Sequence, residues 1–276
     1  MTHVPTIGLN DSQSIPQIGL GVFQIPNDAV SSAVQAALQT GYRHIDTAAA
    51  YGNEEGVGQG IRASGVARNE IFLTTKVWND DQGYDKTLLA IDSSLRRLNV
   101  DYVDLYLIHW PSPGRDLYAA TWRALIRARE MGLARSIGVS NFEIEHLDRI
   151  IGETGVTPVL NQIEVHPRFQ QRRLRQANAQ RGIKTEAWSP LGRGRLLTDP
   201  VIARIAQKHE RTSARIIIRW HLDSDLIVIP KSISLARIKE NFDVFGFALD
   251  ANDMAAIGKL DEAAGRIGPN PMTASF

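Results

Sequence analysis

The chain alternates strand-like and helix-like segments along nearly its whole length, and this alternation limits the folds open to it. Eight short apolar runs predict strands at residues 19–23, 44–47, 71–76, 103–109, 136–140, 159–165, 185–189 and 226–230. Between them lie amphipathic stretches that predict crossover helices, for example 29–39, 84–98, 117–130, 144–151 and 174–180. Strands that alternate with helices indicate a parallel sheet, and eight strands suffice to close a (β/α)8 TIM barrel.

The two ends of the chain add smaller elements to this barrel. Residues 6–9 and 14–18 flank a cluster of turn-forming residues, which predicts a β-hairpin before the first barrel strand. The segment 191–210 predicts an elaborated loop and an extra helix between the last two strands, so extra helices are expected near the C-terminus. Because no linker or charge block interrupts the chain, we expect a single domain over residues 1–276.

Composition excludes several classes of partner and chemistry. The 31 basic and 30 acidic side chains give a net charge of +1, so we expect neither a nucleic acid nor a membrane as partner. The absence of cysteine rules out disulfides and thiolate metal sites, and no histidine spacing argues for another metal site. The start of the chain lacks a signal-peptide pattern, and no apolar run is long enough to cross a membrane. We therefore expect a soluble cytoplasmic protein.

Four polar side chains follow the ends of the first predicted barrel strands. They are Asp46, Tyr51, Lys76 and His109. Because the carboxyl ends of parallel strands meet at one rim, these side chains are expected to converge. Singly, each is more often a solvated or structural residue, but together they favour an active site.

The four residue types suit the protonation of a substrate oxygen. A phenol with a pKa of about 10 is a weak acid at neutral pH. The ammonium of Lys76 is expected to lower the pKa of Tyr51, and Asp46 to keep Lys76 charged and positioned. A neutral His109 could then orient a carbonyl oxygen. This pattern predicts that Tyr51 acts as a general acid.

The sequence around these residues resembles the aldo-keto reductase family, and most closely its small bacterial branch that includes the 2,5-diketo-D-gluconic acid reductases. The resemblance extends over nearly the whole chain. Its motifs are GYRHIDTA at 41–48, YGNE at 51–54, TTKVW at 74–78, LIHWP at 107–111, SIGVSNF at 136–142, NQIEVHP at 161–167, IPKS at 229–232 and EN at 240–241. The resemblance implies a barrel that binds NADPH at the carboxyl rim without a metal and reduces aldehydes and ketones.

Carried over by position, the resemblance implies a cofactor site and a substrate site. Ser140, Asn141 and Gln162 would hold the nicotinamide carboxamide, and Trp188 would stack on its ring. Lys231, Ser232 and Arg237 would clamp the 2′-phosphate. The full cofactor set is Gly21, Val22, Asp46, Ser140, Asn141, Gln162, Trp188, Ser189, Leu191, Lys231, Ser232, Ile233, Arg237, Glu240 and Asn241, with the last two at the adenine. The substrate set is Phe23, Trp78, His109 and Trp110.

Several positions keep two interpretations. Lys231 and Ser232 could simply begin a basic helix, and Ser234 stands where some relatives carry a further basic residue, which would weaken a preference for NADPH over NADH. Arg193 and Arg195 could cover the pyrophosphate or remain in solvent. Met272 could reach the substrate or belong to a frayed end. Trp122, Trp220 and the histidines other than His109 are expected to be structural or at the surface.

Three functions fit the pattern to different degrees. The first is an NADPH-dependent reductase of dicarbonyls, keto-sugars or aromatic aldehydes, acting as a monomer on a small molecule. The second is a sensory protein that binds NADPH with negligible turnover, which the four intact polar residues disfavour. The third is a barrel isomerase or lyase without nicotinamide, which the nicotinamide-binding set disfavours. The sequence does not specify the substrate among these classes.

Overall fold

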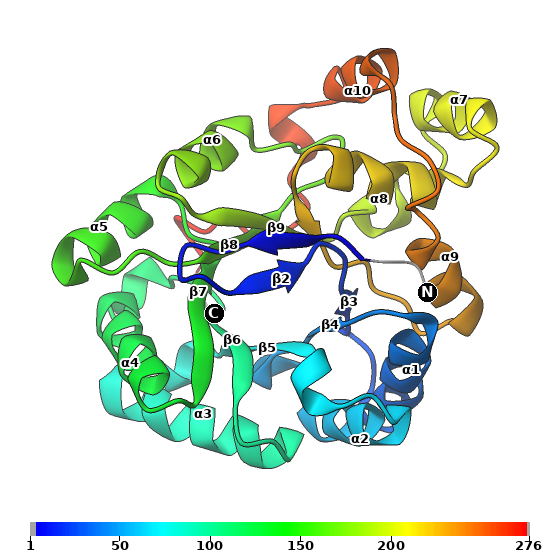
Figure 1. The fold of residues 1–276 in the computed structure, drawn as a ribbon. Coiled ribbons are helices and arrows are strands. Elements are labelled where there is room, and N and C mark those ends of the chain that lie inside the picture. Colours follow the sequence, from blue (N-terminus) through cyan, green and yellow to red (C-terminus); the bar gives the residue numbers. More distant parts are fainter. Residues whose placement is uncertain (1–3, 275–276) are drawn as a thin grey trace.

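Eight parallel strands form a barrel in the computed structural model, which describes residues 4–274 (Figure 1). The strands are β3 (Leu20–Gly21), β4 (His44–Asp46), β5 (Phe72–Val77), β6 (Val103–Ile108), β7 (Ala134–Ser140), β8 (Leu160–Glu164), β9 (Lys184–Trp188) and β10 (Ile227–Val228). Each pairs with the next strand in the sequence. Parallel bridges from Ile18 to Val228 and from Gly21 to Lys231 join the first strand to the last. The predicted (β/α)8 barrel is therefore confirmed.

The two strands at the closing seam are shorter than predicted. Regular pairing of β3 and β10 ends after two residues in each strand, although the backbone continues alongside, with the Gly21 amide donating to Pro230 O at 3.3 Å. A Cβ atom on Gly21 would lie only 2.9 Å from Ile229 O. Glycine thus permits the close approach that closes the barrel.

Helices cover the outside of the barrel, as predicted. The crossover helices are α1 (Asn27–Thr40), α2 (Glu54–Ser64), α3 (Tyr84–Leu98), α4 (Tyr118–Glu130), α5 (Ile144–Thr154), α6 (Arg172–Gln180) and α8 (Ser213–Asp223). The additional helices are α7 (Pro200–Lys208), α9 (Leu235–Phe242) and α10 (Ala251–Gly258), which confirms extra helices near the C-terminus. Glycines at 132 and 182, just beyond two of these helices, have the expected positive φ of 76° and 71°.

The predicted hairpin closes the amino-terminal end of the barrel. It consists of β1 (Thr6–Gly8) and β2 (Ser14–Pro16). In its turn, the Asn10 amide donates to Pro158 O at 3.0 Å, just before β8, and Asp11 accepts from Ser136 Oγ in β7 at 2.7 Å. Ile15 is fully buried beneath the strands. The hairpin therefore covers the end opposite the carboxyl rim.

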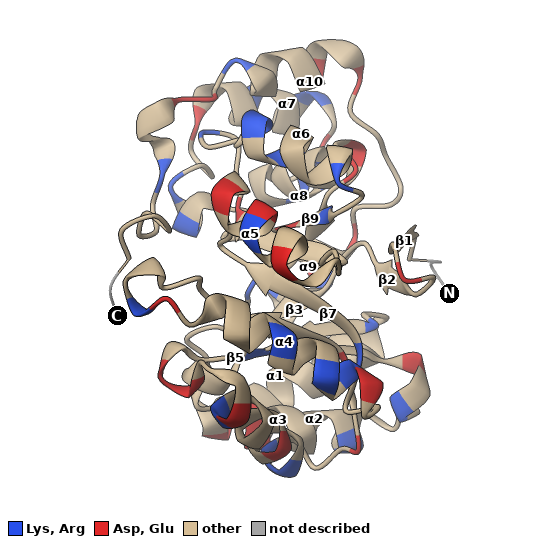
Figure 2. Ribbon diagram, turned by 90° about the vertical axis from the view of Figure 1, so that its left-hand side faces the viewer, with Lys and Arg blue, Asp and Glu red and all other residues tan. Residues whose placement is uncertain are grey.

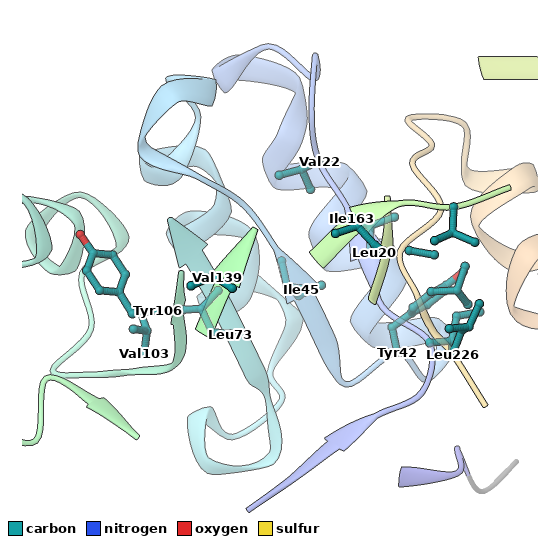
Figure 3. Packing of buried hydrophobic residues seen from close by; sticks show 14 of the residues in the cluster. Leu20, Val22, Tyr42, Ile45, Leu73, Val103, Tyr106, Val139, Ile163 and Leu226 are labelled. Atoms are coloured by element: carbon teal, nitrogen blue, oxygen red, sulfur yellow. The ribbon is translucent and has the colours of Figure 1, made fainter. Parts of the chain in front are cut away.

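The side chains that point into the barrel differ in polarity from those that point outward to the helices. The outward residues, including Ile45, Leu73, Tyr106, Val139 and Ile163, belong to the apolar layer between strands and helices (Figure 3). Trp122 and Trp220 are buried in the same layer, as predicted. Inside the barrel, apolar side chains lie above the hairpin, whereas the carboxyl half holds buried polar residues, namely His44, Asp46, Thr74, Lys76, Gln162 and Glu186.

Charges of both signs alternate over the helices on the side shown in Figure 2. This distribution agrees with the near-neutral composition. Among the helices of residues 4–274, none has the length and apolar character that a membrane span requires.

Candidate active site

Asp46, Tyr51, Lys76 and His109 come together at the carboxyl rim. Lys76 Nζ, at the end of β5, donates to Asp46 Oδ1 at 2.7 Å and to Thr47 O at 2.9 Å. The same nitrogen lies 5.2 Å from the centre of the Tyr51 ring, which ends the short 3-10 helix η1 (Ala49–Tyr51). The rings of Tyr51 and His109 are 5.6 Å apart and nearly perpendicular. The structure thus places the four residues in one cluster.

Asn53 holds the loop that carries Tyr51. Its side-chain nitrogen donates to Val22 O at 3.0 Å and to Ile25 O at 2.9 Å, and its oxygen accepts from Thr47 Oγ1 at 2.8 Å. The side chain is fully buried. These three hydrogen bonds tie the loop after β4 to the loop after β3. They therefore fix the position of the Tyr51 phenol.

Burial and charge act in opposite directions on the ionisable groups of the cluster. Burial alone would lower the pKa of Lys76, but the negative charge of Asp46, the interaction with Tyr51 and the hydrogen bond to Asp46 outweigh burial and raise the pKa. Lys76 therefore stays protonated. Burial raises the pKa of Asp46, and the Lys76 ammonium and the Gln162 amide oppose that rise. Burial and the charge of Lys76 hold the pKa of His109 well below its usual value, which keeps the imidazole neutral as expected.

The pKa of Tyr51 corrects one part of the prediction. Lys76 does lower it, by its charge and by a hydrogen bond, but burial of the phenol is the larger effect. The net pKa of Tyr51 therefore lies above the ordinary value rather than below it. Lys76 reduces the cost of forming a buried phenolate and does not eliminate it.

The predicted nicotinamide residues form a connected group beside this cluster. Trp188 Nε1 donates to Asn141 Oδ1 at 2.9 Å, and Asn141 Nδ2 donates to His109 O at 2.9 Å. Ser140 Oγ donates to Gln162 O at 2.8 Å. Asn141 has a positive φ of 63°, a conformation that asparagine tolerates better than most residues. The group therefore has fixed amides and hydroxyls next to an indole face.

The structure adds a residue that the sequence reasoning missed, Glu186 in β9. Gln162 Nε2 donates to Glu186 Oε2 at 2.7 Å and to Asp46 Oδ2 at 2.8 Å. Burial and the neighbouring Asp46 charge raise the pKa of Glu186 to about 8. His44 Nε2 lies 3.6 Å from Glu186 Oε1, and burial lowers the pKa of this histidine to about 3. The one feature of the sequence that could have pointed to Glu186 is the presence of an acidic residue within a predicted apolar strand.

Replacing Glu186 with glutamine is expected to stabilise the protein more at pH 8.5 than at pH 5. The pKa of Glu186 is higher in the folded protein than in the unfolded chain, where it is about 4.3. Its stabilising contribution is therefore complete below that unfolded pKa and is lost as the pH rises to about 8. Glutamine never ionises. We expect the difference in unfolding free energy between the two proteins to grow by on the order of 4 kcal/mol across this range. Thermal unfolding at both pH values measures it.

An exposed acid provides the control for that comparison. Glu55 lies at the surface in α2, and Glu55→Gln is expected to show a much smaller change with pH. Equal pH dependence of the two variants would mean that Glu186 is ionised at pH 5 and would contradict the raised pKa.

Aromatic side chains and the C-terminal segment surround the mouth of the site. The Phe23 ring lies 5.0 Å from that of Tyr51 and is 48% exposed, and the Trp78 ring lies 5.1 Å from that of His109. Trp110 is mostly buried. Glu164, at the end of β8, accepts hydrogen bonds from the amides of Ile267 at 2.6 Å and Gly268 at 2.8 Å.

Gly268 shows how closely this segment approaches the indole of Trp188. A Cβ on Gly268 would lie 2.5 Å from Trp188 Cη2, so the segment packs directly on that ring. Met272 is 44% exposed, and its backbone amide donates to Asn270 Oδ1 at 3.1 Å.

The residues predicted for the adenosine end gather around the start of α9. Ser234 caps this helix by accepting from the Arg237 amide, and its own amide donates to Ser232 Oγ at 3.1 Å. Lys231 and Arg237 are exposed cations, whereas Glu240 accepts from Thr212 Oγ1, just before α8, at 2.5 Å. The remaining predicted contacts lie along the same rim: Gly21 at the end of β3 and Val22 after it, Ser189 and Leu191 after β9, and Ile233 and Asn241 around α9.

Two further arginines lie in the loop after β9. Arg193 and Arg195 are both exposed, and the 3-10 helix η5 (Gly192–Gly194) contains the first of them. Within residues 4–274, no group of three histidine or acidic side chains is arranged to hold a metal ion.

Comparison with known proteins agrees with this site. The model of the aldo/keto reductase family matches residues 17–262. An aldo-keto reductase of Mycobacterium sp. (strain JLS) is 55% identical over 272 residues, which cover 99% of this chain and 98% of the relative. Methylglyoxal reductase DkgA of Escherichia coli (strain K12) is 51% identical over 273 residues, 98% of each chain. A crystal structure of a Gox0644 mutant in complex with NADPH has a TM-score of 0.96 and 53% identity and covers 100% of both chains.

These matches extend over the barrel, the four-residue cluster and the rim. They confirm the resemblance that the motifs predict, including its bacterial branch. The chain belongs to the aldo/keto reductase family and is an oxidoreductase.

Proposed function

We propose that the protein reduces small aldehydes and ketones with NADPH, using Tyr51 as general acid. The observation that carries this proposal is the buried Lys76–Asp46 pair, with its 2.7 Å contact, held against the Tyr51 phenol and beside a neutral His109. The name of the E. coli relative and the NADPH complex of the Gox0644 mutant support the substrate class and the cofactor.

The residues at the rim fit the proposed cofactor. Ser140, Asn141 and Gln162 offer amide and hydroxyl groups beside the flat face of Trp188, which suits a ring that carries a carboxamide. Lys231 and Arg237 provide exposed cations for a phosphate at the other end. When bound, NADPH supplies the hydride. The predicted contacts by Gly21, Val22, Ser189, Leu191, Ile233, Glu240 and Asn241 belong to the same proposal.

The protein's own groups handle the carbonyl oxygen. His109, neutral and packed against Trp78, orients the substrate oxygen by a hydrogen bond. The Tyr51 phenol gives its proton to that oxygen as negative charge develops on it, and Lys76 stabilises the phenolate that remains. Phe23, Trp78 and Trp110 enclose the reacting carbon with apolar surface and exclude water.

The aromatic and polar residues around the site favour small substrates. Aromatic walls with a single polar corner suit dicarbonyls and keto-sugars. We propose that the chain functions as a cytoplasmic monomer with one domain over residues 1–276.

The direct test follows NADPH oxidation by absorbance with methylglyoxal, a diketo-sugar acid and benzaldehyde. We expect turnover with at least the dicarbonyl. The turnover number is expected to fall at roughly 1–10³ s⁻¹, the range typical of enzymes. Tight NADPH binding without turnover on any carbonyl would contradict the proposal and favour the sensory function. Failure to bind NADPH at all would favour an isomerase or lyase.

A further inference from the structure

Glu186 is a buried acid inside the barrel to which the proposed reaction assigns no step. It lies in β9, in register with Gln162 of β8 on one side and with Ile227 of β10 on the other. Its side chain is fully buried, with Oε1 3.6 Å from His44 Nε2. A carboxyl group in such a place is costly unless its hydrogen bonds are satisfied. Among residues 4–274, its one hydrogen bond to a side chain comes from Gln162.

The contacts of Gln162 determine which way its amide faces. One hydrogen of Nε2 is donated to Asp46 Oδ2 at 2.8 Å and the other to Glu186 Oε2 at 2.7 Å. If the amide were turned over, its oxygen would face the Asp46 carboxylate, which repels it, and Nε2 would lose its bonds to both Asp46 and Glu186. With both hydrogens engaged inside the protein, Oε1 is the atom that the amide can offer to another molecule. Asp46 and Glu186, from different strands, therefore each hold one hydrogen of Nε2 and together favour this orientation.

The neighbours of Glu186 are compatible with this role. Besides Asp46, the charge of Lys76 from β5 acts on Glu186, Tyr51 interacts with its charge, and His44 Nε2 from β4 lies 3.6 Å from its Oε1 and stays neutral. Gly19 leaves room for that histidine, because a Cβ there would lie 2.5 Å from His44 Nδ1. Glu186 reaches Gln162 within the regular register of β8 with β9.

We propose that Glu186 is a positioning residue, which together with Asp46 orients Gln162 so that Oε1 accepts a hydrogen bond from the carboxamide nitrogen of the nicotinamide cofactor. This inference rests on the proposed function, since it assumes that the cofactor lies against Gln162. It assigns to Glu186 a part in recognising the carboxamide, separate from proton transfer.

A cofactor analogue that lacks the carboxamide nitrogen isolates this contact. In 3-acetylpyridine adenine dinucleotide phosphate, a methyl ketone replaces the amide and cannot donate to Oε1. We expect the wild-type protein to bind NADP⁺ about tenfold more tightly than the analogue, because the analogue cannot form the hydrogen bond to Gln162 Oε1. In Glu186→Leu the orientation of Gln162 is no longer fixed, and the ratio is expected to fall to within about twofold. Quenching of tryptophan fluorescence gives the dissociation constants.

Two variants separate positioning from a general loss of structure. Glu186→Gln can still accept from Gln162 Nε2 and is expected to restore the wild-type ratio. Asp104 is a mostly buried acid near the opposite end of the barrel, where it bonds the Leu73 amide at 3.0 Å and Arg68 at 2.7 Å. Asp104→Asn is expected to lower stability yet keep the ratio. Should the leucine variant fail to fold, Glu186→Met provides the same loss of acceptor with a more flexible side chain.

The outcomes distinguish this inference from the proposed function. If the wild-type protein turns over carbonyls and Glu186→Leu keeps the full preference for NADP⁺ over the analogue, Glu186 has no positioning role. Equal weakening of both ligands in Glu186→Leu would likewise reduce Glu186 to a structural residue. If the wild-type protein binds neither ligand, the proposed function itself is wrong.

Discussion

Tyr51→Phe is expected to lower the turnover number with a dicarbonyl by about 10²- to 10⁴-fold, the usual contribution of a positioned general acid. The substitution removes one oxygen and leaves the ring contacts to Phe23 and His109, at 5.0 and 5.6 Å, in place. The dissociation constant for NADPH is expected to stay within about twofold, because Tyr51 is not among the residues proposed to hold the cofactor. Steady-state kinetics and fluorescence titration measure the two quantities.

A second buried tyrosine provides the matched control. Tyr106 lies in β6 among the outward side chains, and its hydroxyl has no hydrogen-bond partner among residues 4–274. Tyr106→Phe is expected to keep wild-type turnover. If Tyr51→Phe also kept it, another group would have to donate the proton, and the role proposed for Tyr51 would be wrong.

Lys76→Met is expected to lower the free energy of unfolding by about 3–5 kcal/mol at pH 8, as breaking a buried ion pair generally does. The loss corresponds to a fall in melting temperature on the order of 10 °C. Lys76 and Asp46 are both almost fully buried, and the variant leaves the carboxylate without its 2.7 Å partner. Turnover should also collapse, since nothing then stabilises a phenolate at Tyr51.

The effect on stability should shrink as the pH falls. Loss of Lys76 removes the charge that opposes burial, so the pKa of Asp46 rises further and the folded variant takes up a proton. A smaller difference from wild type at pH 5 than at pH 8 is therefore expected. Adding Asp46→Asn to the variant removes both charges and should recover most of the stability but not the turnover. Thermal unfolding of all three proteins is the measurement, and a double variant no more stable than the single one would contradict the argument.

Much of the fold could be predicted because its signals are local. Apolar runs give the strands, and periodic stretches such as 84–98 give helices with nearly the bounds observed. Helix α2 lies outside the stretches that periodicity picked out. Its glycines lower the intrinsic preference for a helix but permit contact, since a Cβ on Gly58 would lie 2.1 Å from Leu98 O. Such close packing depends on distant residues and leaves no periodic pattern.

The candidate site was predictable to the extent that its residues stand at strand ends. Convergence of Asp46, Lys76 and His109 follows from parallel strands sharing a rim. The raised pKa of Tyr51 does not follow from composition, because it depends on how completely the folded chain buries the phenol. Glu186 was equally hidden, since only the register of β8 with β9 brings it to Gln162. Distances across the barrel interior are set by three-dimensional packing.

The asymmetry of the barrel bears on how the protein could be attached to a surface or joined to another domain. The hairpin bonds to the starts of β7 and β8, whereas Ile267 and Gly268 bond to the end of β8, so the two ends of the described chain lie on opposite sides (Figure 2). An immobilising linker before Val4 would leave the mouth of the candidate site facing bulk solution. A bulky fusion after Ala274 would crowd the diffusion path of substrate.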